Sequence, residues 1–168
     1  MMNRLSIDIA VNEVLRNNWD WKVPVDLKRI AQSLNIRVEP LSQLEQQEGI
    51  SGSAFIDENN RMVAKYSPNE STNRQRFTIA HELGHFLLNH VTRENTRYRA
   101  DSINSFSSRT FDPSEAEANE FAANVLMPKP AIEHFMNNTE LSSVEELASA
   151  FQVSEAAMYY RLKNLNLI

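Results

Sequence analysis

The segment at residues 76–90 constrains the fold more than any other part of the chain. It reads RFTIAHELGHFLLNH and contains the pattern H-E-x-x-H from His81 to His85. An α-helix turns by about 100° per residue, so residues four apart return to nearly the same face. On a helix, His81 and His85 therefore project side by side and can bind one metal ion. Glu82 lies beside the pair, where a carboxylate can take a proton from a metal-bound water molecule.

The residues around this pattern predict that it lies on a helix. Ser67, Pro68 and Glu70 fit an N-cap, a first helical residue and a capping-box partner. We therefore predict a helix from about residue 68 to residue 90. Gly84 costs this helix about 1 kcal/mol relative to alanine, which suggests that another element packs closely there. An apolar stripe at helical spacing runs beside the histidines and comprises Ile79, Leu83, Phe86, Leu87 and His90.

The composition narrows both the metal chemistry and the class of protein. The chain has no cysteine, so any metal site uses histidine, aspartate or glutamate. Its 168 residues and 42% hydrophobic content suit one domain, or one domain with a small appendage. A net charge of −5 disfavours general nucleic-acid binding. Residues 1–20 contain no long apolar run, so we expect neither a signal peptide nor a membrane span, and a cytoplasmic protein.

Two histidines do not complete a catalytic zinc site, which takes three protein ligands and a water molecule. One known extension of the pattern places a glycine and a further histidine after the second ligand, but Leu88 and Val91 occupy those positions. His90 falls on the opposite side of the predicted helix from His81 and is interpreted as a core or surface residue. His134 belongs to a separate short helix and is a weak candidate.

A glutamate on a second helix is the better candidate for the third ligand. Glu115 and Asn119 are four residues apart and share a helical face, which can present a ligating carboxylate and a supporting amide together. The alternative is that Glu115 only closes a capping box with Asp112. Glu117 is the fallback ligand, although Glu117 and Glu120 point away from that face and are expected to be solvated.

The rest of the chain predicts short elements and one long irregular loop. Residues 41–48 are predicted as a loop or a weak helix, and residues 91–112 as a loop that lies near the metal site. The predicted strands are 36–38 and the hairpin 50–66 with a turn at 57–60; the other predicted helices are 5–17, 24–34, 112–127, 131–137, 142–151 and 155–163.

Three of these segments admit two interpretations. The small residues 51–54 leave room for edge pairing with an extended peptide, or they mark a bulge at Gly52. The arginines of residues 91–112 can contact a substrate, although a solvated loop is the favoured interpretation. Trp19 and Trp21 can pack against the protein or form a platform for a ligand, and packing is the favoured interpretation.

Residues 142–165 have the spacing of a helix-turn-helix, with a turn at residues 152–154 between two short helices. The surrounding segment, 129–168, carries three basic residues against five acidic ones and has a net charge of −2. DNA is strongly anionic, so we favour a packing or protein-contact role over direct DNA binding.

The two motifs, taken together, resemble the ImmA/IrrE family of metallo-endopeptidases. RFTIAHELGHFLLNH is followed, about 30 residues after His85, by EAEANEFAANVLMP, and this ordered pair is more specific than H-E-x-x-H alone. The helix PVDLKRIAQSLNI and the hairpin segment GISGSAFID are also similar to the family's lead-in, so the resemblance covers residues 24–128. The tail VEELASAFQVSEAAMYYRLKNLNLI resembles the helix-turn-helix-like segment that follows in such proteins.

The resemblance implies a gluzincin-like peptidase core. By position, it implies that His81, His85 and Glu115 bind Zn²⁺, that Glu82 is the general base and that Asn119 supports the site. It also implies that the substrate is a helix-turn-helix (XRE-like) transcriptional repressor whose cleavage releases genes of a mobile element or a stress response. Some members of the family resemble partners in toxin–antitoxin pairs.

We therefore expect an α+β protein with a zincin-like core. In this fold a small antiparallel sheet packs on the two motif helices, residues 1–128 form the peptidase domain and residues 129–168 form the helix-turn-helix-like tail. Tyr98, Arg97 and Arg99 are candidates for stabilising the oxyanion. The expected activity is zinc-assisted hydrolysis of a peptide bond. The alternatives are a zinc-fold module that sequesters a repressor without proteolysis and a DNA-binding regulator that uses the tail.

Overall fold

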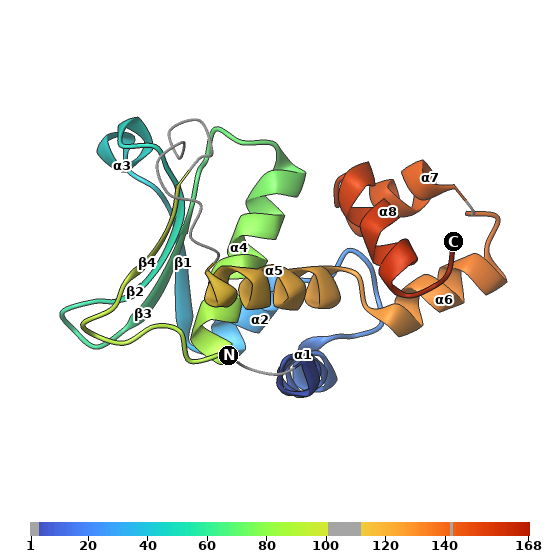
Figure 1. Cartoon of the computed structure of the whole chain (residues 1–168), viewed down its shortest axis with the longest axis horizontal. Helices are drawn as coiled ribbons and strands as arrows, with labels where there is room; N and C mark the ends of the chain where they lie inside the picture. Colours follow the sequence, from blue (N-terminus) through green and yellow to red (C-terminus); the bar gives the residue numbers. More distant parts are fainter. Residues whose placement is uncertain (1–3, 101–111, 142) are drawn as a thin grey trace.

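The computed structural model describes residues 4–100, 112–141 and 143–168. A sheet lies at one end of the molecule, two crossing helices lie in the middle, and a group of short helices lies at the other end (Figure 1). No helix in the described ranges is long and apolar enough to cross a membrane. In chain order the elements are α1 (Arg4–Asn18), α2 (Leu27–Ser33), β1 (Ile36–Pro40), α3 (Gln43–Gln47), β2 (Ile50–Ile56), β3 (Met62–Tyr66), α4 (Thr72–Leu87), β4 (Arg97–Ala100), α5 (Pro113–Leu126), α6 (Lys129–Asn138), α7 (Val144–Phe151) and α8 (Glu155–Asn164).

The sheet confirms the α+β class but is mixed, so the expectation of a wholly antiparallel sheet is wrong. Its strand order is β1-β3-β2-β4. The hairpin strands β2 and β3 are antiparallel, and β4 is antiparallel to β2. β1, however, runs parallel to β3. The helix α3 lies between β1 and β2 in the sequence. This connection is longer than a tight turn, so β1 can pair with β3 in the parallel direction.

β2 is an inner strand, so it does not offer the edge that peptide pairing needs. It lies between β3 and β4, and its pairing with β4 is irregular between Ile50 and Gly52. The bulge interpretation of residues 51–54 is therefore the one that the structure supports. The prediction of an irregular loop over residues 91–112 also needs correction, because Arg97–Ala100 forms β4. Residues 101–111 of that prediction lie outside the described residues.

The helix α4 begins later than predicted. Its N-cap is Ser71, whose side chain accepts a hydrogen bond from the backbone N–H of Arg74, so the predicted N-cap at Ser67 is wrong. At the other end the helix stops at Leu87, and Asn89 adopts a left-handed conformation with φ of 58°. Because an asparagine tolerates this conformation well, it turns the chain away from the helical path just before His90.

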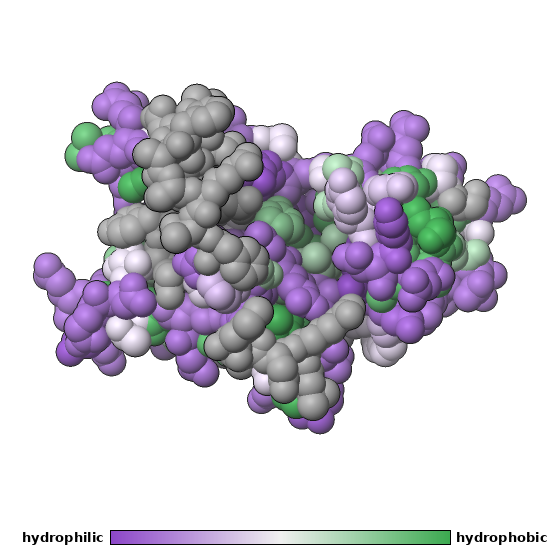
Figure 2. Space-filling view, viewed as in Figure 1, coloured by the Kyte–Doolittle hydropathy of each residue, from purple (hydrophilic) through white to green (hydrophobic). Residues whose placement is uncertain are grey.

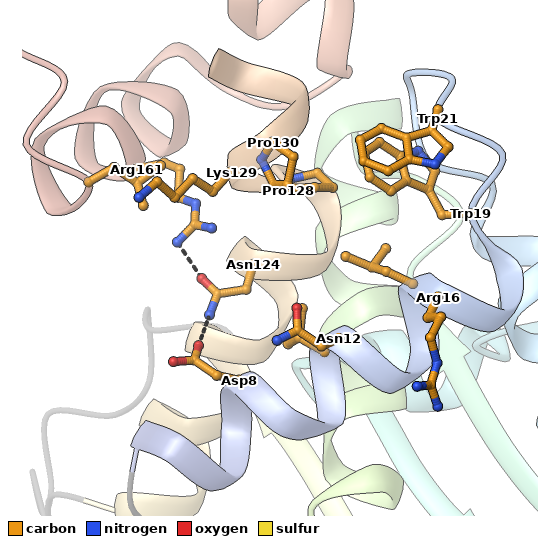
Figure 3. A pocket seen from close by; sticks show the side chains of 13 residues that line it. Asp8, Asn12, Arg16, Trp19, Trp21, Asn124, Pro128, Lys129, Pro130 and Arg161 are labelled. Carbon is orange, nitrogen blue, oxygen red and sulfur yellow. Dashed lines mark hydrogen bonds between the residues drawn. The ribbon is translucent and has the colours of Figure 1, made fainter. Parts of the chain in front are cut away.

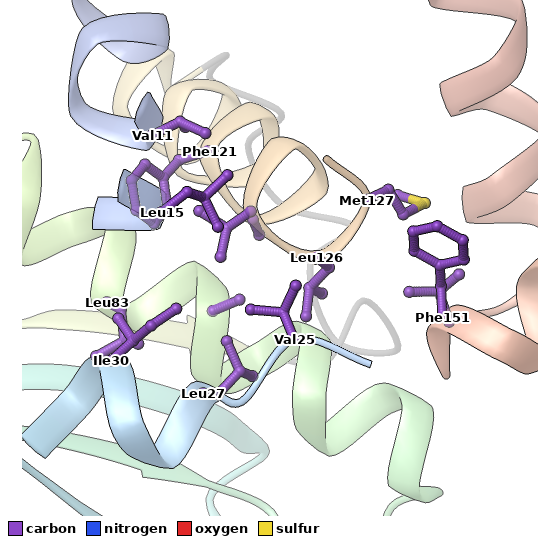
Figure 4. Close-up of a cluster of buried hydrophobic side chains, with 14 of the residues drawn as sticks. Val11, Leu15, Val25, Leu27, Ile30, Leu83, Phe121, Leu126, Met127 and Phe151 are labelled. Atoms are coloured by element: carbon purple, nitrogen blue, oxygen red, sulfur yellow. The ribbon is translucent and has the colours of Figure 1, made fainter. Parts of the chain in front are cut away.

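The core forms where α4 is covered on both sides. α4 packs against β2 and β3, and α5 packs across α4. A Cβ atom on Gly84 would lie 2.9 Å from Cδ1 of Phe121 on α5, so the missing side chain sets how closely the two helices approach. Figure 4 shows Phe121 and Leu83 in this core, with Leu15 of α1 and Ile30 of α2 covering it.

The tail helices α7 and α8 have the predicted helix-turn-helix spacing and pack on the end of α5. Gln152 ends α7 in a left-handed conformation, and Ser154 caps α8. Phe151 is fully buried and lies beside Met127 at the end of α5 (Figure 4). Arg161 of α8 donates a hydrogen bond to the backbone carbonyl of Met127 over 3.0 Å. The tail is therefore attached to the core by apolar and polar contacts.

Candidate metal centre

Two helices bring the candidate ligands together. His81 and His85 project from α4 toward α5 and are 0% and 1% exposed. Glu115 lies in the first turn of α5, where Asp112 is the N-cap and Pro113 begins the helix, as predicted. Its side chain is 34% exposed. The cluster is therefore buried on the α4 side and open to solvent on the Glu115 side, as a catalytic metal site must be if a substrate is to reach it.

The two imidazole nitrogens and the carboxylate of Glu115 converge on one point between α4 and α5. Nε2 of His81 and Nε2 of His85 are 3.0 Å apart. Nε2 of His81 lies 3.1 Å from Oε2 of Glu115, and Nε2 of His85 lies 3.1 Å from Oε1 of the same carboxylate. Tetrahedral coordination with bonds of about 2.1 Å would space ligand atoms by about 3.4 Å, close to these separations. Two imidazole nitrogens and a carboxylate oxygen in this arrangement can hold one metal ion.

The charge of Glu115 also suits a cation site. Burial by itself raises the pKa of this carboxyl, but when no metal is bound and the His81 and His85 rings are also protonated on Nε2, their hydrogen bonds and their charges lower it further than burial raises it. The resulting pKa lies well below the ordinary value for glutamate, so the side chain is a carboxylate at neutral pH. An anion that faces two imidazole nitrogens supplies the negative charge that a divalent ion needs.

Asn119 holds His81 from the side away from the cluster. Its Oδ1 atom lies 2.9 Å from Nδ1 of His81. An amide oxygen only accepts hydrogen bonds, so this contact places the ring proton on Nδ1 and leaves the Nε2 lone pair facing the other ligand atoms. The structure thus brings Asn119 and Glu115, which are one helical turn apart on α5, to the two ends of the same imidazole ring.

His85 is held by a longer hydrogen-bonded chain that sequence reasoning missed. Nδ1 of His85 lies 3.0 Å from Nδ1 of His90, and Nε2 of His90 lies 2.9 Å from the carboxylate of Glu117. The carboxylate accepts from His90 Nε2–H, so His90 Nδ1 can accept from His85 Nδ1–H. This order of protons leaves Nε2 of His85 with its lone pair toward the cluster.

This chain corrects the interpretation of two residues. His90 does not lie on the far face of α4, because the helix ends at Leu87 and the left-handed Asn89 turns His90 back toward His85. Glu117 is not solvated, since it is buried at 7% exposure against His90. Asn89 is the one sequence signal for this arrangement, because asparagine is a common left-handed stop that takes the following residue out of helical phase.

Glu82 is almost fully buried, with 1% exposure, beside the inner strand β2. A Cβ atom on Gly52 would lie 2.6 Å from Cγ2 of Thr78 and closer still to Oε1 of Glu82. The small residue at the bulge of β2 therefore leaves space for the Glu82 carboxylate. On α4, Glu82 directly follows His81, the first of the candidate metal ligands.

The remaining candidates do not join the cluster. His134 is exposed on α6 and contacts Asn138, so it is not a ligand in this arrangement. Arg97, Tyr98 and Arg99 lie on β4, but their side chains lie outside the described part of the structure.

A separate cavity of about 620 Å³ lies between α1, the end of α5 and α8. Trp19 and Trp21 stack at its rim with ring centroids 4.6 Å apart, and Trp21 is 69% exposed (Figure 3). Asn124 lies at the centre of the cavity wall, where it donates to Asp8 and accepts from Arg161. None of the residues that line this cavity belongs to the histidine–glutamate cluster, so it is not part of the candidate metal centre.

Comparison with known families agrees with the chemistry of the site. The peptidase M78 family model, described as the IrrE N-terminal-like domain, matches residues 31–163. The match contains both motif helices and extends into α8. No curated protein matches the chain.

Proposed function

Because the chain belongs to the peptidase M78 family of IrrE N-terminal-like domains and is a metallopeptidase, we propose that it is a zinc-dependent endopeptidase. In this proposal His81, His85 and Glu115 bind the zinc ion, Glu82 is the general base and Asn119 positions His81. The observation that carries the proposal is the cluster of ligand atoms, in which two imidazole nitrogens lie 3.0 Å apart and each lies 3.1 Å from a different oxygen of the Glu115 carboxylate.

Zinc suits this donor set better than the other common metal ions of proteins. Magnesium and calcium prefer cages made only of oxygen, whereas imidazole nitrogen with one carboxylate is typical of catalytic zinc. The cluster also leaves one side open, since Glu115 is 34% exposed. A structural zinc site would instead be closed by a fourth protein ligand.

The residues of this chain would divide the work of hydrolysis as follows. Bound zinc would polarise the scissile carbonyl and lower the pKa of a water molecule in the site. Glu82 takes a proton from the attacking water on its carboxylate and then delivers that proton to the leaving amine. Asn119 and His90 keep the two histidine rings in the tautomer that binds through Nε2. The burial of Glu82 keeps bulk water away from the proton that it carries.

The substrate of a peptidase is a protein or peptide, and we propose that here it is a helix-turn-helix (XRE-like) repressor. The support is the similarity of both motifs and the tail to the ImmA/IrrE family. We also propose that residues 1–128 carry the chemistry and that residues 129–168 contact protein, not DNA. The net charge of −2 on the tail supports this assignment.

Replacement of the general base tests the mechanism. In Glu82→Gln, zinc content should match that of the wild type, and cleavage of a proteome-derived peptide library, read by mass spectrometry, should fall by about 10²-fold or more. Glu133→Gln, on α6 and outside the metal centre, is the matched control and should cleave normally. Equal cleavage by Glu82→Gln and the wild type would remove Glu82 as the base. Intact helix-turn-helix repressors can then be offered to the wild type and scored for a single cut.

A further inference from the structure

A groove separates the metal-site helices from the tail. Its first wall consists of Phe77 on α4 together with residues of α5, and its second wall consists of residues of α8. We call this space the α5–α8 groove and define it by Phe77, Asn119, Glu120, Ala123, Tyr160 and Asn164. Its volume is about 570 Å³, within the range of about 300–1,000 Å³ that ligand-binding clefts occupy. Figure 2 shows this recess between the two ends of the molecule.

The groove continues past the start of α8. A second hollow of about 400 Å³ lies between the first turn of α4 and the turn that joins α7 to α8. The two spaces share Phe77 and Ala157, so they meet along one side of α8. A polypeptide in extended conformation needs a trough of this kind more than a closed pocket, because it enters at one end and leaves at the other.

The groove begins next to the metal centre, one turn of α5 beyond Glu115 and on the Nδ1 side of the His81 ring. Asn119 lines the groove, and the same side chain accepts the hydrogen bond from Nδ1 of His81 over 2.9 Å. Phe77 also lines it, and its ring centroid lies 6.4 Å from that of His81. A chain whose scissile bond lies at the metal centre would therefore have neighbouring residues within reach of the groove, since each extended residue advances about 3.3 Å.

The α8 wall is held in place by contacts on both sides. The Asn73 side chain of α4 donates a hydrogen bond over 3.0 Å to the carbonyl of Val153, in the turn before α8. Arg161 donates to Met127 and Asn124 at the end of α5. Met158 and Leu162 are buried under α8 at 0% and 1% exposure. The wall is thus preformed, which lowers the entropy cost of binding a flexible segment.

The lining of the groove matches the chemistry of a polypeptide. Asn119 and Asn164 offer amide groups that can pair with backbone N–H and C=O groups. Phe77, Ala123 and Tyr160 offer apolar surface for a side chain. Tyr160 is 62% exposed in spite of its size, and an exposed aromatic side chain at a groove wall is typical of a binding contact.

We propose that the α5–α8 groove binds a segment of the protein substrate next to the scissile bond, and that Tyr160 selects an apolar side chain of that segment. The tail is then one wall of the substrate site and not a separate DNA-binding unit. This inference rests on the proposed peptidase function.

The absence of native cysteine allows a test at single positions. Tyr160→Cys places one thiol on the groove wall. Tyr159→Cys is the matched control, since Tyr159 is the adjacent α8 residue, is 44% exposed and does not line the groove. Each zinc-loaded variant is labelled with a bulky maleimide and assayed on a peptide that the wild type cleaves in a proteome-derived library. We expect labelling at position 160 to reduce kcat/KM by tenfold or more through KM, and labelling at position 159 to change it less than twofold.

A binding measurement separates substrate contact from a general loss of activity. The same two cysteine variants are then made in the Glu82→Gln background, labelled, and tested for binding of the uncut peptide. The label at position 160 should raise the Kd by tenfold or more, the label at position 159 should change it less than twofold, and both proteins should retain wild-type zinc content. Equal effects of the two labels, or no effect of either, would overturn the inference while leaving the peptidase function intact. A zinc-loaded wild type that cleaves no library peptide would count against the proposed function itself, and the inference would fall with it.

Discussion

Each histidine of the candidate metal centre is fixed by one hydrogen bond on Nδ1. For His81 the acceptor is the side chain of Asn119, and for His85 it is His90, which is itself held by Glu117. In both cases the bond selects the tautomer whose Nε2 lone pair faces the other candidate ligands. Partners of this kind fix the orientation of the imidazole ring and raise its basicity, so their removal should weaken metal binding without removing a ligand.

The His90 chain gives a prediction at this scale. His90→Ala and Glu117→Gln should each lower zinc affinity by about 10–100-fold, because His85 would lose the partner that fixes its ring. Competition with a chromophoric chelator measures this affinity independently of activity. His134→Ala, an exposed histidine on α6, is the control and should bind zinc as the wild type does. Wild-type affinity in His90→Ala would show that the chain does not support the site.

The sequence predicted the candidate ligands of this centre better than the residues that hold those ligands in place. Helical spacing alone pointed to His81, His85 and the α5 face of Glu115 and Asn119, since residues four apart share a face wherever the helix lies. The same spacing misplaced His90 and Glu117. It assumed that α4 continued through residue 90, whereas the helix ends at Leu87. The contact between His90 and Glu117 depends on how α4 and α5 cross, and residue spacing within one helix cannot predict that crossing. The roles assigned to these residues stay predictions until metal binding is measured.

Among the helices, the close crossing of α4 and α5 depends on Gly84. A Cβ atom there would lie 2.9, 3.2 and 3.3 Å from three atoms of Phe121, which is itself 1% exposed. The backbone of α4 therefore touches a buried aromatic ring with no room for a methyl group. Since α5 carries Glu115, this contact also sets the distance from the carboxylate to the two histidines.

Gly84→Ala should destabilise the protein although alanine is the better helix former. Helix propensity would favour the change by about 1 kcal/mol, while overpacking of a tight core costs about 1–3 kcal/mol. We expect a net loss of about 1 kcal/mol in the free energy of unfolding, measured by urea denaturation. Phe121→Leu removes ring atoms from the contact. The double variant should therefore lose less free energy of unfolding than the sum of the losses in the two single variants. A more stable Gly84→Ala protein would contradict this account of the crossing.

Elements with strong local signals were predictable, and elements that depend on distant pairing were not. The hairpin of β2 and β3 and the start of α5 follow from turn and capping residues near them in sequence. The four residues of β4 are too short a run to stand out from the polar segment around them, and the strand forms because β2 offers it a partner across the sheet. The parallel pairing of β1 with β3 is likewise a choice of neighbour that the residues of β1 do not encode.

On the scale of the whole molecule, the tail helix α8 and the motif helices α4 and α5 line one groove. Its attachment joins residues far apart in the chain, such as Asn73 with Val153, and no local pattern predicts such a contact. The helix-turn-helix spacing and the unfavourable charge for DNA binding were both predictable from the sequence, but the groove was not. The family match runs through the proposed boundary at residue 128 and into α8, as expected if tail and core act together.

The metal content of the purified protein tests the central claim most directly. Elemental analysis of the wild type, after exposure to zinc at neutral pH, should give close to one zinc ion per chain. His81→Ala should contain none, Glu115→Gln should bind zinc more weakly, and Glu133→Gln should match the wild type. A wild type that contains no zinc would contradict the proposed peptidase. Normal zinc content in Glu115→Gln together with loss in Glu117→Gln would contradict the assignment of Glu115 as the third ligand.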